Sequence, residues 1–299
     1  MLGNSIDLHM HSYYSDDGEF SPEELVRQCC DSGIKVMAIA DHNCVRANEE
    51  GERAAARAGI TYIPAVEIDC TFRGVNLHVL GYGIDYRQPD FAEIEDHIAR
   101  QGREASRQML LATRRLGFDV SEDEMAELAA GNYRKDQWTG EMFAEALLGR
   151  PEYKDHPLLR PYRPGGERSD NPLVNFYWDY YSQGKSCYVK IEYPELEQTV
   201  NVIHRHGGRA ALAHPGVNLK GRSELLGPVI ETGVDGVEAF SSYHSPSECL
   251  YFYQEAVRNK VFFTCGSDYH GKTKPGIKLG GHGCQAPGED ILCQLKQIL

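Results

Sequence analysis

The chain has 299 residues, 41% of them hydrophobic and 25% charged, and a formal net charge of −13 at pH 7. This length and composition are enough to bury a large core without disulfide bonds. The acidic balance argues against a broad contact with nucleic acid, which needs a basic surface. The sequence also has no run of 18 apolar residues that would predict a membrane span.

Short apolar runs alternate with amphipathic segments along most of the chain, a pattern typical of β-α units with a parallel sheet. In chain order we expect a strand over 5–11, a helix over 21–33, a strand over 35–43, a helix over 48–59, strands over 61–70 and 75–83, a helix over 194–208, a strand over 209–216, a helix over 221–233, a strand over 235–244, a helix over 245–260 and a strand over 261–270. The helix over 21–33 has Ser21 as its N-cap and Pro22 at its first position. The expected fold class is therefore α/β, with a sheet that is closed or nearly closed.

The rhythm changes between residues 91 and 186. Residues 91–149 have the periodicity of several helices, and 150–175 are rich in Pro, Arg and Gly. A long irregular segment inside a compact fold usually has a function of its own. We expect a main domain formed by 1–90 and 187–299, and a mainly helical insertion over 91–186 that covers its active site.

The cysteines and the N-terminus indicate the compartment. Nine cysteines are scattered without CxxC pairs, which predicts reduced thiols and argues against a disulfide framework or a thiolate zinc site. The first residues run into a strand and do not resemble a basic and apolar leader. We expect a cytoplasmic soluble protein with no membrane partner.

The first strand ends in HMH, so two histidines project from the same face about 7 Å apart. Other predicted strands also carry His, Asp or Glu near their ends, and in β/α barrels such ends converge on one face. The nine groups are His9, His11, Asp16, His42, Glu67, His78, His214, Asp268 and His270. So many ligand-type groups are costly together without cations. Imidazoles and carboxylates without thiolates point to divalent ions of Mn, Zn or Fe.

A second HxH segment, His204 to His206, serves as an internal control. It lies at the end of a predicted helix, where residues i and i+2 diverge by about 200°. We expect these two histidines to interact with the helix C-terminus and not to bind a metal.

The ordered series HMHSYYSDDG, ADHN, VEI, LHVLGYGID, ALAHPG and GSDYHGKTKPGIKLG resembles the PHP family, named for polymerase and histidinol phosphatase. The resemblance covers roughly residues 1–86 and 187–282. It implies a distorted (β/α)7 TIM-like barrel with a two- or three-metal centre that hydrolyses phosphate esters.

By motif position the resemblance also implies three ligand sets. The first ion would be bound by His9, His11, Glu67 and Asp268, the second by Glu67, His78 and His214, and the third by Asp16, His42 and His270. Because every ligand position holds a ligating residue type, this favours an active enzyme over a degenerate domain.

For the reaction, we expect a hydroxide that bridges two metals to attack phosphorus in line. The residues assigned to catalysis are Glu67, Asp268 and His244, the last as a possible acid for the leaving oxygen. Arg134, Arg168, His244 and Lys274 are the candidate phosphate-binding residues, since guanidinium groups bind phosphate in a bidentate manner. For each of them an ordinary structural or surface role stays open. Trp138, Tyr177 and Trp178 could stack on a base or form part of the core.

The substrate is the least determined part. We expect a small phosphorylated sugar or nucleotide, and in one version the enzyme opens a cyclic phosphodiester and then removes the monoester. The alternative within the family is a 5′-3′ exonuclease or a 3′,5′-nucleotide bisphosphate phosphatase. A different class is a metal- and phosphate-binding module without turnover. Long nucleic acid is not expected as a partner.

Overall fold

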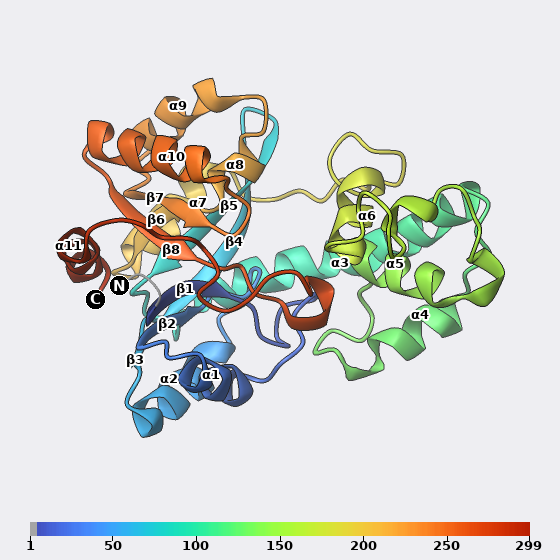
Figure 1. The fold of residues 1–299 in the computed structure, drawn as a ribbon, viewed down its shortest axis with the longest axis horizontal. Coiled ribbons are helices and arrows are strands. Elements are labelled where there is room, and N and C mark those ends of the chain that lie inside the picture. Colours follow the sequence, from blue (N-terminus) through green and yellow to red (C-terminus); the bar gives the residue numbers. More distant parts are fainter. Residues whose placement is uncertain (1–4) are drawn as a thin grey trace.

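The computed structural model of the chain describes residues 5–299. Within these residues, eight strands form two sheets (Figure 1). The first sheet is parallel, with strands β1 (Ile6–Met10), β2 (Val36–Ile39) and β3 (Thr61–Tyr62) in that order. The second has the order β4 (Ala65–Phe72), β5 (Val75–Tyr82), β6 (Arg209–Leu212), β7 (Gly236–Ser241) and β8 (Phe262–Gly266).

The α/β class is confirmed, but the sheet is not all parallel. β5 runs antiparallel to both β4 and β6, whereas β6, β7 and β8 are mutually parallel. The cause is a two-residue turn, Arg73 and Gly74, in which both residues have positive φ (50° and 78°). Two such residues form the tight turn that suits a β-hairpin, so no helix intervenes between β4 and β5.

The two sheets meet through isolated bridges. Met10 pairs with Tyr269 just beyond β8, and His42 pairs with Glu67 of β4, both in parallel orientation. No continuous ladder closes a barrel among residues 5–299. The two sheets touch at both edges, close to the metal-binding motifs, while the distorted (β/α)7 barrel stays a prediction.

Helices cover the outer faces of the sheets (Figure 1). They are α1 (Pro22–Asp31), α2 (Ala47–Ala58), α7 (Leu196–Arg205), α8 (Pro215–Asn218), α9 (Leu226–Glu231), α10 (Pro246–Asn259) and α11 (Gly288–Ile298). Ser21 and Glu24 form a capping box at the start of α1. The helix α11 was not among the expected elements.

Residues 89–187 build a second, mainly helical body on the right of Figure 1. Its helices are α3 (Pro89–Arg115), α4 (Glu122–Leu128), α5 (Gly140–Gly149) and α6 (Pro172–Tyr180). Short 3-10 turns lie at Ala129–Gly131, Pro151–Tyr153 and Arg160–Tyr162 in this body, and at Ser223–Leu225 and Gly271–Thr273 elsewhere. Phe143, Leu147, Leu159 and Phe176 are fully buried in its own apolar cluster. The long helix α3 connects this cluster to the sheets.

Candidate metal centre

The HMH segment ends β1 with both histidines fully buried. Because alternate residues on a strand share a face, Nε2 of His9 and Nε2 of His11 lie only 3.2 Å apart. Two ring nitrogens at this separation suit a shared ligand-binding point. The geometry expected from the sequence is present.

Glu67 on β4 lies at the middle of the cluster and is fully buried. Its Oε2 is 3.2 Å from His9 Nε2, 3.3 Å from His11 Nε2 and 3.2 Å from His42 Nδ1, while its Oε1 is 3.1 Å from both His78 Nδ1 and His214 Nε2. The two oxygens thus face two different sets of histidines. A carboxylate in this position is suited to join two cation sites.

Asp268 and His214 enter the cluster from turns with strained backbones. Their φ angles are 56° and 21°, a region that non-glycine residues seldom adopt. Asp268 Oδ1 lies 3.0 Å from His11 Nε2 and 3.2 Å from His9 Nε2. The strain is localised at residues whose side chains must point inward.

A further group joins His11 to the loop that follows β1. Ligand atoms of His11, Asp17, His42 and His270 lie within 4.8 Å of one another, and Asp17 Oδ2 is 3.0 Å from His270 Nε2. The sequence analysis assigned Asp16 to this position, whereas the structure brings its neighbour Asp17 into the group. SDDG contains two adjacent aspartates, and the turn geometry that selects one of them is not evident from the residue types.

Asp69 was missed by the sequence analysis. It lies two residues after Glu67, hence on the same face of β4, and its Oδ1 is 3.2 Å from His78 Nε2. His78 does not come from a strand end, because it lies opposite Asp69 in the middle of the β4–β5 hairpin. His42, Asp69 and His78 form a third potential ligand group. The alternation in VEID was the available signal for Asp69.

The hydrogen bonding of these side chains tests whether they suit metal ions. Six ligand-type atoms in the cluster are buried and form no hydrogen bond of suitable geometry, although several lie 3.0–3.3 Å from another ligand-type group. They are Asp17 Oδ1, His42 Nδ1, Glu67 Oε2, His214 Nδ1, Asp268 Oδ1 and His270 Nε2. Buried polar atoms are rarely left unpaired, and nitrogen and oxygen donors without thiolates suit Zn, Mn or Fe. The residues therefore fit a centre of divalent cations.

The electrostatics reflect the same crowding. Burial would raise the pKa of Glu67, but His9, His42 and His78 outweigh it and hold this pKa well below its usual range. Burial lowers the pKa of His11 to about 4, helped by the neighbouring His270 and His42. Glu67 is thus ionised and His11 neutral at pH 7, the forms in which both can ligate a cation.

Three residues outside the ligand groups fix the ligands in place. Glu238 on β7, fully buried, lies 3.0 Å from His9 Nδ1 and also accepts the backbone N–H of His214. Asp268 Oδ2 accepts hydrogen bonds from Lys274 Nζ at 2.7 Å and from the Tyr243 hydroxyl at 2.6 Å. Such outer contacts orient metal ligands. Only Lys274 was among the predicted site residues; the buried carboxylate in GVEAF was the missed signal for Glu238.

His244, predicted as a catalytic acid, has no ring nitrogen left for substrate. Its Nδ1 lies 3.0 Å from the carbonyl oxygen of Ala239, and its Nε2 accepts the backbone N–H of Gly216 at 3.0 Å. This pairing requires the neutral tautomer with the proton on Nδ1, and burial lowers the pKa of the ring. The structure therefore gives His244 a role in holding the 214–218 turn, which corrects the predicted catalytic and substrate-binding roles.

The two predicted phosphate-binding arginines are both in ion pairs. Arg168 forms a bidentate pair with Asp179 at 3.1 Å for both contacts, which uses the fork that phosphate would need. Arg134 pairs with Glu95 of α3. Trp138 is buried in the helical cluster beside Phe143, so it belongs to the core.

The helical body contributes side chains next to the cluster. Trp178 of α6 packs edge-on against Tyr243 with ring centroids 5.5 Å apart. Burial, followed by repulsion from Asp17, raises the pKa of Glu141 on α5 to about 8. The amide of Gly276, near Lys274, donates to Asn171 Oδ1 at 2.8 Å. Residues of α5 and α6 therefore border the candidate metal centre.

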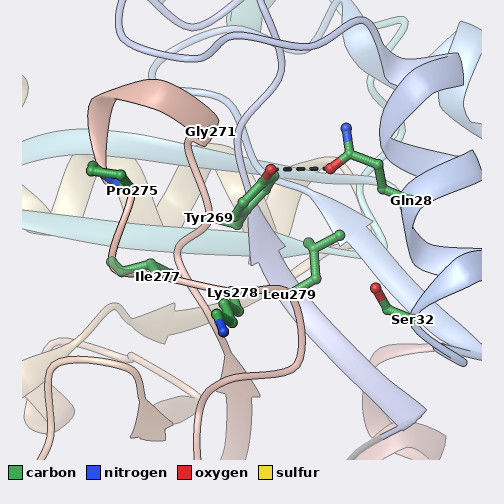
Figure 2. Close-up of a pocket in the computed structure, with 8 residues that line it drawn as sticks. All are labelled: Gln28, Ser32, Tyr269, Gly271, Pro275, Ile277, Lys278 and Leu279. Atoms are coloured by element: carbon green, nitrogen blue, oxygen red, sulfur yellow. Dashed lines mark hydrogen bonds between the residues drawn. The ribbon is translucent and has the colours of Figure 1, made fainter.

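A separate pocket of about 450 Å³ lies between α1 and the 271–279 loop (Figure 2). It is lined by Gln28, Ser32, Tyr269, Gly271, Pro275, Ile277, Lys278 and Leu279, and the Tyr269 hydroxyl donates to Gln28 Oε1 at 3.0 Å. None of the potential metal ligands lines it, so the pocket and the metal centre are different features.

Comparison with known proteins shows which family part of this chain resembles. The model of the PHP domain matches residues 7–150. Over this segment the chain is similar to PHP domains, in agreement with the resemblance found in the ordered motifs. The matched segment ends before His214, Asp268 and His270.

Curated relatives resemble nearly the whole chain. A 3′,5′-nucleoside bisphosphate phosphatase from Chromobacterium violaceum is 29% identical over 92% of this chain and 90% of its own length. The 5′-3′ exoribonuclease Rnm from Escherichia coli is 28% identical, covering 92% and 87%. A phosphoribosyl 1,2-cyclic phosphate 1,2-diphosphodiesterase from Eggerthella lenta is 26% identical, covering 89% and 94%. All three names denote phosphoester hydrolysis, in agreement with the predicted enzyme class.

A solved structure also resembles this chain. An amidohydrolase from Chromobacterium violaceum, described with bound sulfate and no metal, aligns with a TM-score of 0.74 at 27% identity. The alignment covers 96% of this chain and 89% of that one. Separately, no helix within residues 5–299 is both long and apolar enough to cross a membrane.

Proposed function

We propose that this protein is a metal-dependent phosphoesterase that acts on a small phosphorylated nucleotide or sugar. The observation that carries the proposal is the set of buried ligand atoms around Glu67 that have no hydrogen-bond partner. His9, His214, Glu67 and Asp268 would hold one ion, and the groups around Asp17 and Asp69 would hold others. Bound Mn, Zn or Fe ions would supply an activated water and neutralise phosphoryl oxygens.

The chain's own residues prepare this site. Glu238 orients the His9 ring, and Lys274 with Tyr243 turns Asp268 so that Oδ1 faces the histidines. Lys274 is buried, and although burial would lower its pKa, the charge of Asp268 raises it, so the amine is positive. This charge would attract a phosphate group. Trp178 and Tyr243 would restrict water on the side of α6.

The substrate class follows from charge and from the relatives. With a net charge of −13 the protein is poorly suited to long RNA. A small phosphate ester fits better, and this class includes cyclic phosphodiesters. One water would open the cyclic phosphodiester to a monoester, and a second water would then hydrolyse the monoester to an alcohol and inorganic phosphate. The 3′,5′-nucleoside bisphosphate named for one relative is the second candidate, because that relative has the highest identity of the three compared.

A phosphate-release screen with metal-loaded protein tests the proposal. The panel contains adenosine 5′-monophosphate, adenosine 3′,5′-bisphosphate, ribose 1,2-cyclic phosphate, 2′,3′-cyclic nucleotides and a short 5′-phosphorylated RNA. We expect phosphate release from small esters to exceed nucleotide release from RNA. Protein that contains two or three ions per chain but hydrolyses no ester would instead be a binding module. Preferred cleavage of RNA would identify an exonuclease.

A further inference from the structure

A pair of arginines lies at the border between the sheets and the helical body. Arg46, just before α2, places Nε 3.1 Å from Oε1 of Glu95, and Arg134 of the helical body contacts the same oxygen. Glu95 is buried, with 3% of its surface exposed. Both guanidinium carbons lie over the ring of Tyr133, at 5.3 Å and 5.5 Å from its centroid.

The charges of this cluster do not balance. Glu95 forms an ion pair with both guanidinium groups, so these three side chains together carry one positive charge. Each guanidinium has five N–H donors, and within residues 5–299 Glu95 supplies the only hydrogen-bond acceptor for either group. Arg46 is 49% exposed and Arg134 18% exposed, so both can receive a ligand.

The cluster lies beside the candidate metal centre. Arg46 follows His42 by four residues, in the turn that leaves the end of β2. The ring of Tyr133 packs edge-on against Tyr14, 5.1 Å away, in the loop between His11 and Asp17. The Arg134 charge also acts on Asp16 in that loop. The arginines therefore border the same loops that carry the potential metal ligands.

We propose that Arg46 and Arg134 form a second anion site, which binds a phosphate group of the substrate other than the one that is hydrolysed. The inference rests on the proposed function and narrows it to substrates with two phosphate groups. Paired guanidinium groups suit the tetrahedral, doubly charged form of phosphate. The 3′-phosphate of a nucleoside bisphosphate is a group of this kind. The next phosphodiester in a short RNA has the same tetrahedral shape but only one negative charge.

The test compares substrates that differ only in the second phosphate. For wild-type protein, Arg46→Ala and Arg46→Lys, kcat/KM is measured with adenosine 5′-monophosphate, adenosine 3′,5′-bisphosphate and 5′-phosphorylated diadenylate. We expect Arg46→Ala to lower the ratio of bisphosphate to monophosphate kcat/KM about 10- to 100-fold, mainly through KM, with partial recovery in Arg46→Lys. A fall confined to the diadenylate ratio assigns the site to a phosphodiester, which also supports a second anion site.

Arg87→Ala is the matched control. Arg87 also lies over a tyrosine, with its Cζ 4.4 Å from the Tyr86 ring centroid, and its Nη2 lies 3.9 Å from Oε2 of Glu52. Arg87 follows β5, at the end of the β4–β5 hairpin that is away from the turn. Its ratios should equal those of the wild type. Unchanged ratios in Arg46→Ala, or equal losses for all three substrates, would overturn the second anion site.

Calorimetric binding separates this inference from the proposed function. Metal-loaded wild-type protein should bind adenosine 3′,5′-bisphosphate more tightly than the monophosphate, and Arg46→Ala should remove most of that difference. If wild-type protein shows this preference without hydrolysing any ester, the anion site stands and the enzymatic proposal fails. Equal affinities for both nucleotides would overturn the anion site even in an active enzyme.

Discussion

Two His-x-His segments of this chain have the same spacing and opposite surroundings. In β1, Nε2 of His9 and Nε2 of His11 are 3.2 Å apart and fully buried. At the end of α7, His204 pairs with Asp235 at 2.6 Å, and His206 pairs with Asp90 at 2.9 Å. The strand directs two rings to one point, whereas the helix sends them to two different carboxylates.

The two pairs of histidines also differ in how their ring nitrogens are paired with carboxylates. Each helical histidine contacts a different aspartate, and an arginine contacts the same aspartate, so these polar groups are paired without a further ligand. In the β1 cluster, several histidines share the oxygens of Glu67, and some ligand atoms remain without a hydrogen-bond partner. A ligand-binding site is indicated by shared and incompletely paired groups, and not by the HxH spacing alone.

The largest effect is expected from Glu67→Ala. Its two oxygens contact both sets of histidines, so its loss should remove the connection between cation sites. We expect kcat to fall at least about 10³-fold, as for other groups that act only through an assembled metal site. Circular dichroism checks that the variant is folded. Wild-type turnover by a folded Glu67→Ala protein would contradict the central position of this residue.

The pH dependence of stability tests whether burial and the charge of Asp17 keep Glu141 on α5 protonated. With the pKa of Glu141 at about 8, the folded chain keeps a proton that the unfolded chain loses near its ordinary value of 4.5. Stability should therefore fall as pH rises from about 4.5 to 8.

In chelator-treated protein, we expect Glu141→Gln to reduce this fall by roughly 2 kcal/mol between about pH 5.5 and 7.5, measured by urea unfolding. Glu127→Gln, exposed on α4, is the control and should retain the fall. Parallel curves for wild type and Glu141→Gln would show that Glu141 does not keep its proton.

The neighbouring aspartates of SDDG can be separated. Asp17 lies 3.0 Å from His270 Nε2, whereas Asp16 is outside the ligand groups. We expect Asp17→Asn to lower metal affinity about 10- to 100-fold, and Asp16→Asn to change it by less than about 3-fold. Competition with a chromogenic chelator measures both affinities. The reverse order would restore Asp16 as the ligand.

A smaller effect is expected from Glu238→Gln. The amide keeps the shape and one acceptor but loses the charge that orients His9. We expect metal affinity to fall about 10-fold, with the KM for substrate unchanged, because Glu238 is a positioning residue. An increase in KM with full metal content would indicate that Glu238 acts on the substrate instead.

The sequence was sufficient to predict the fold class and most of the residues of the cluster, but not the strand directions or the supporting contacts. The β-α alternation and the strand positions of the histidines were sufficient for the class and for most of the cluster. The antiparallel β5 was not predicted, because it depends on the positive φ of Arg73, a residue that rarely signals a hairpin. Asp69 and Glu238 were missed inside apolar strands, and the bonding of His244 to Gly216 depends on tertiary structure.

Metal content tests the central claim most directly. Elemental analysis would compare wild-type protein with His9→Ala/His11→Ala and His204→Ala/His206→Ala. The account predicts two or three divalent ions per chain in the wild type and in the helical double variant, and a loss of at least one ion in the strand double variant. Full metal content after replacement of His9 and His11, or equal loss in both variants, would contradict it.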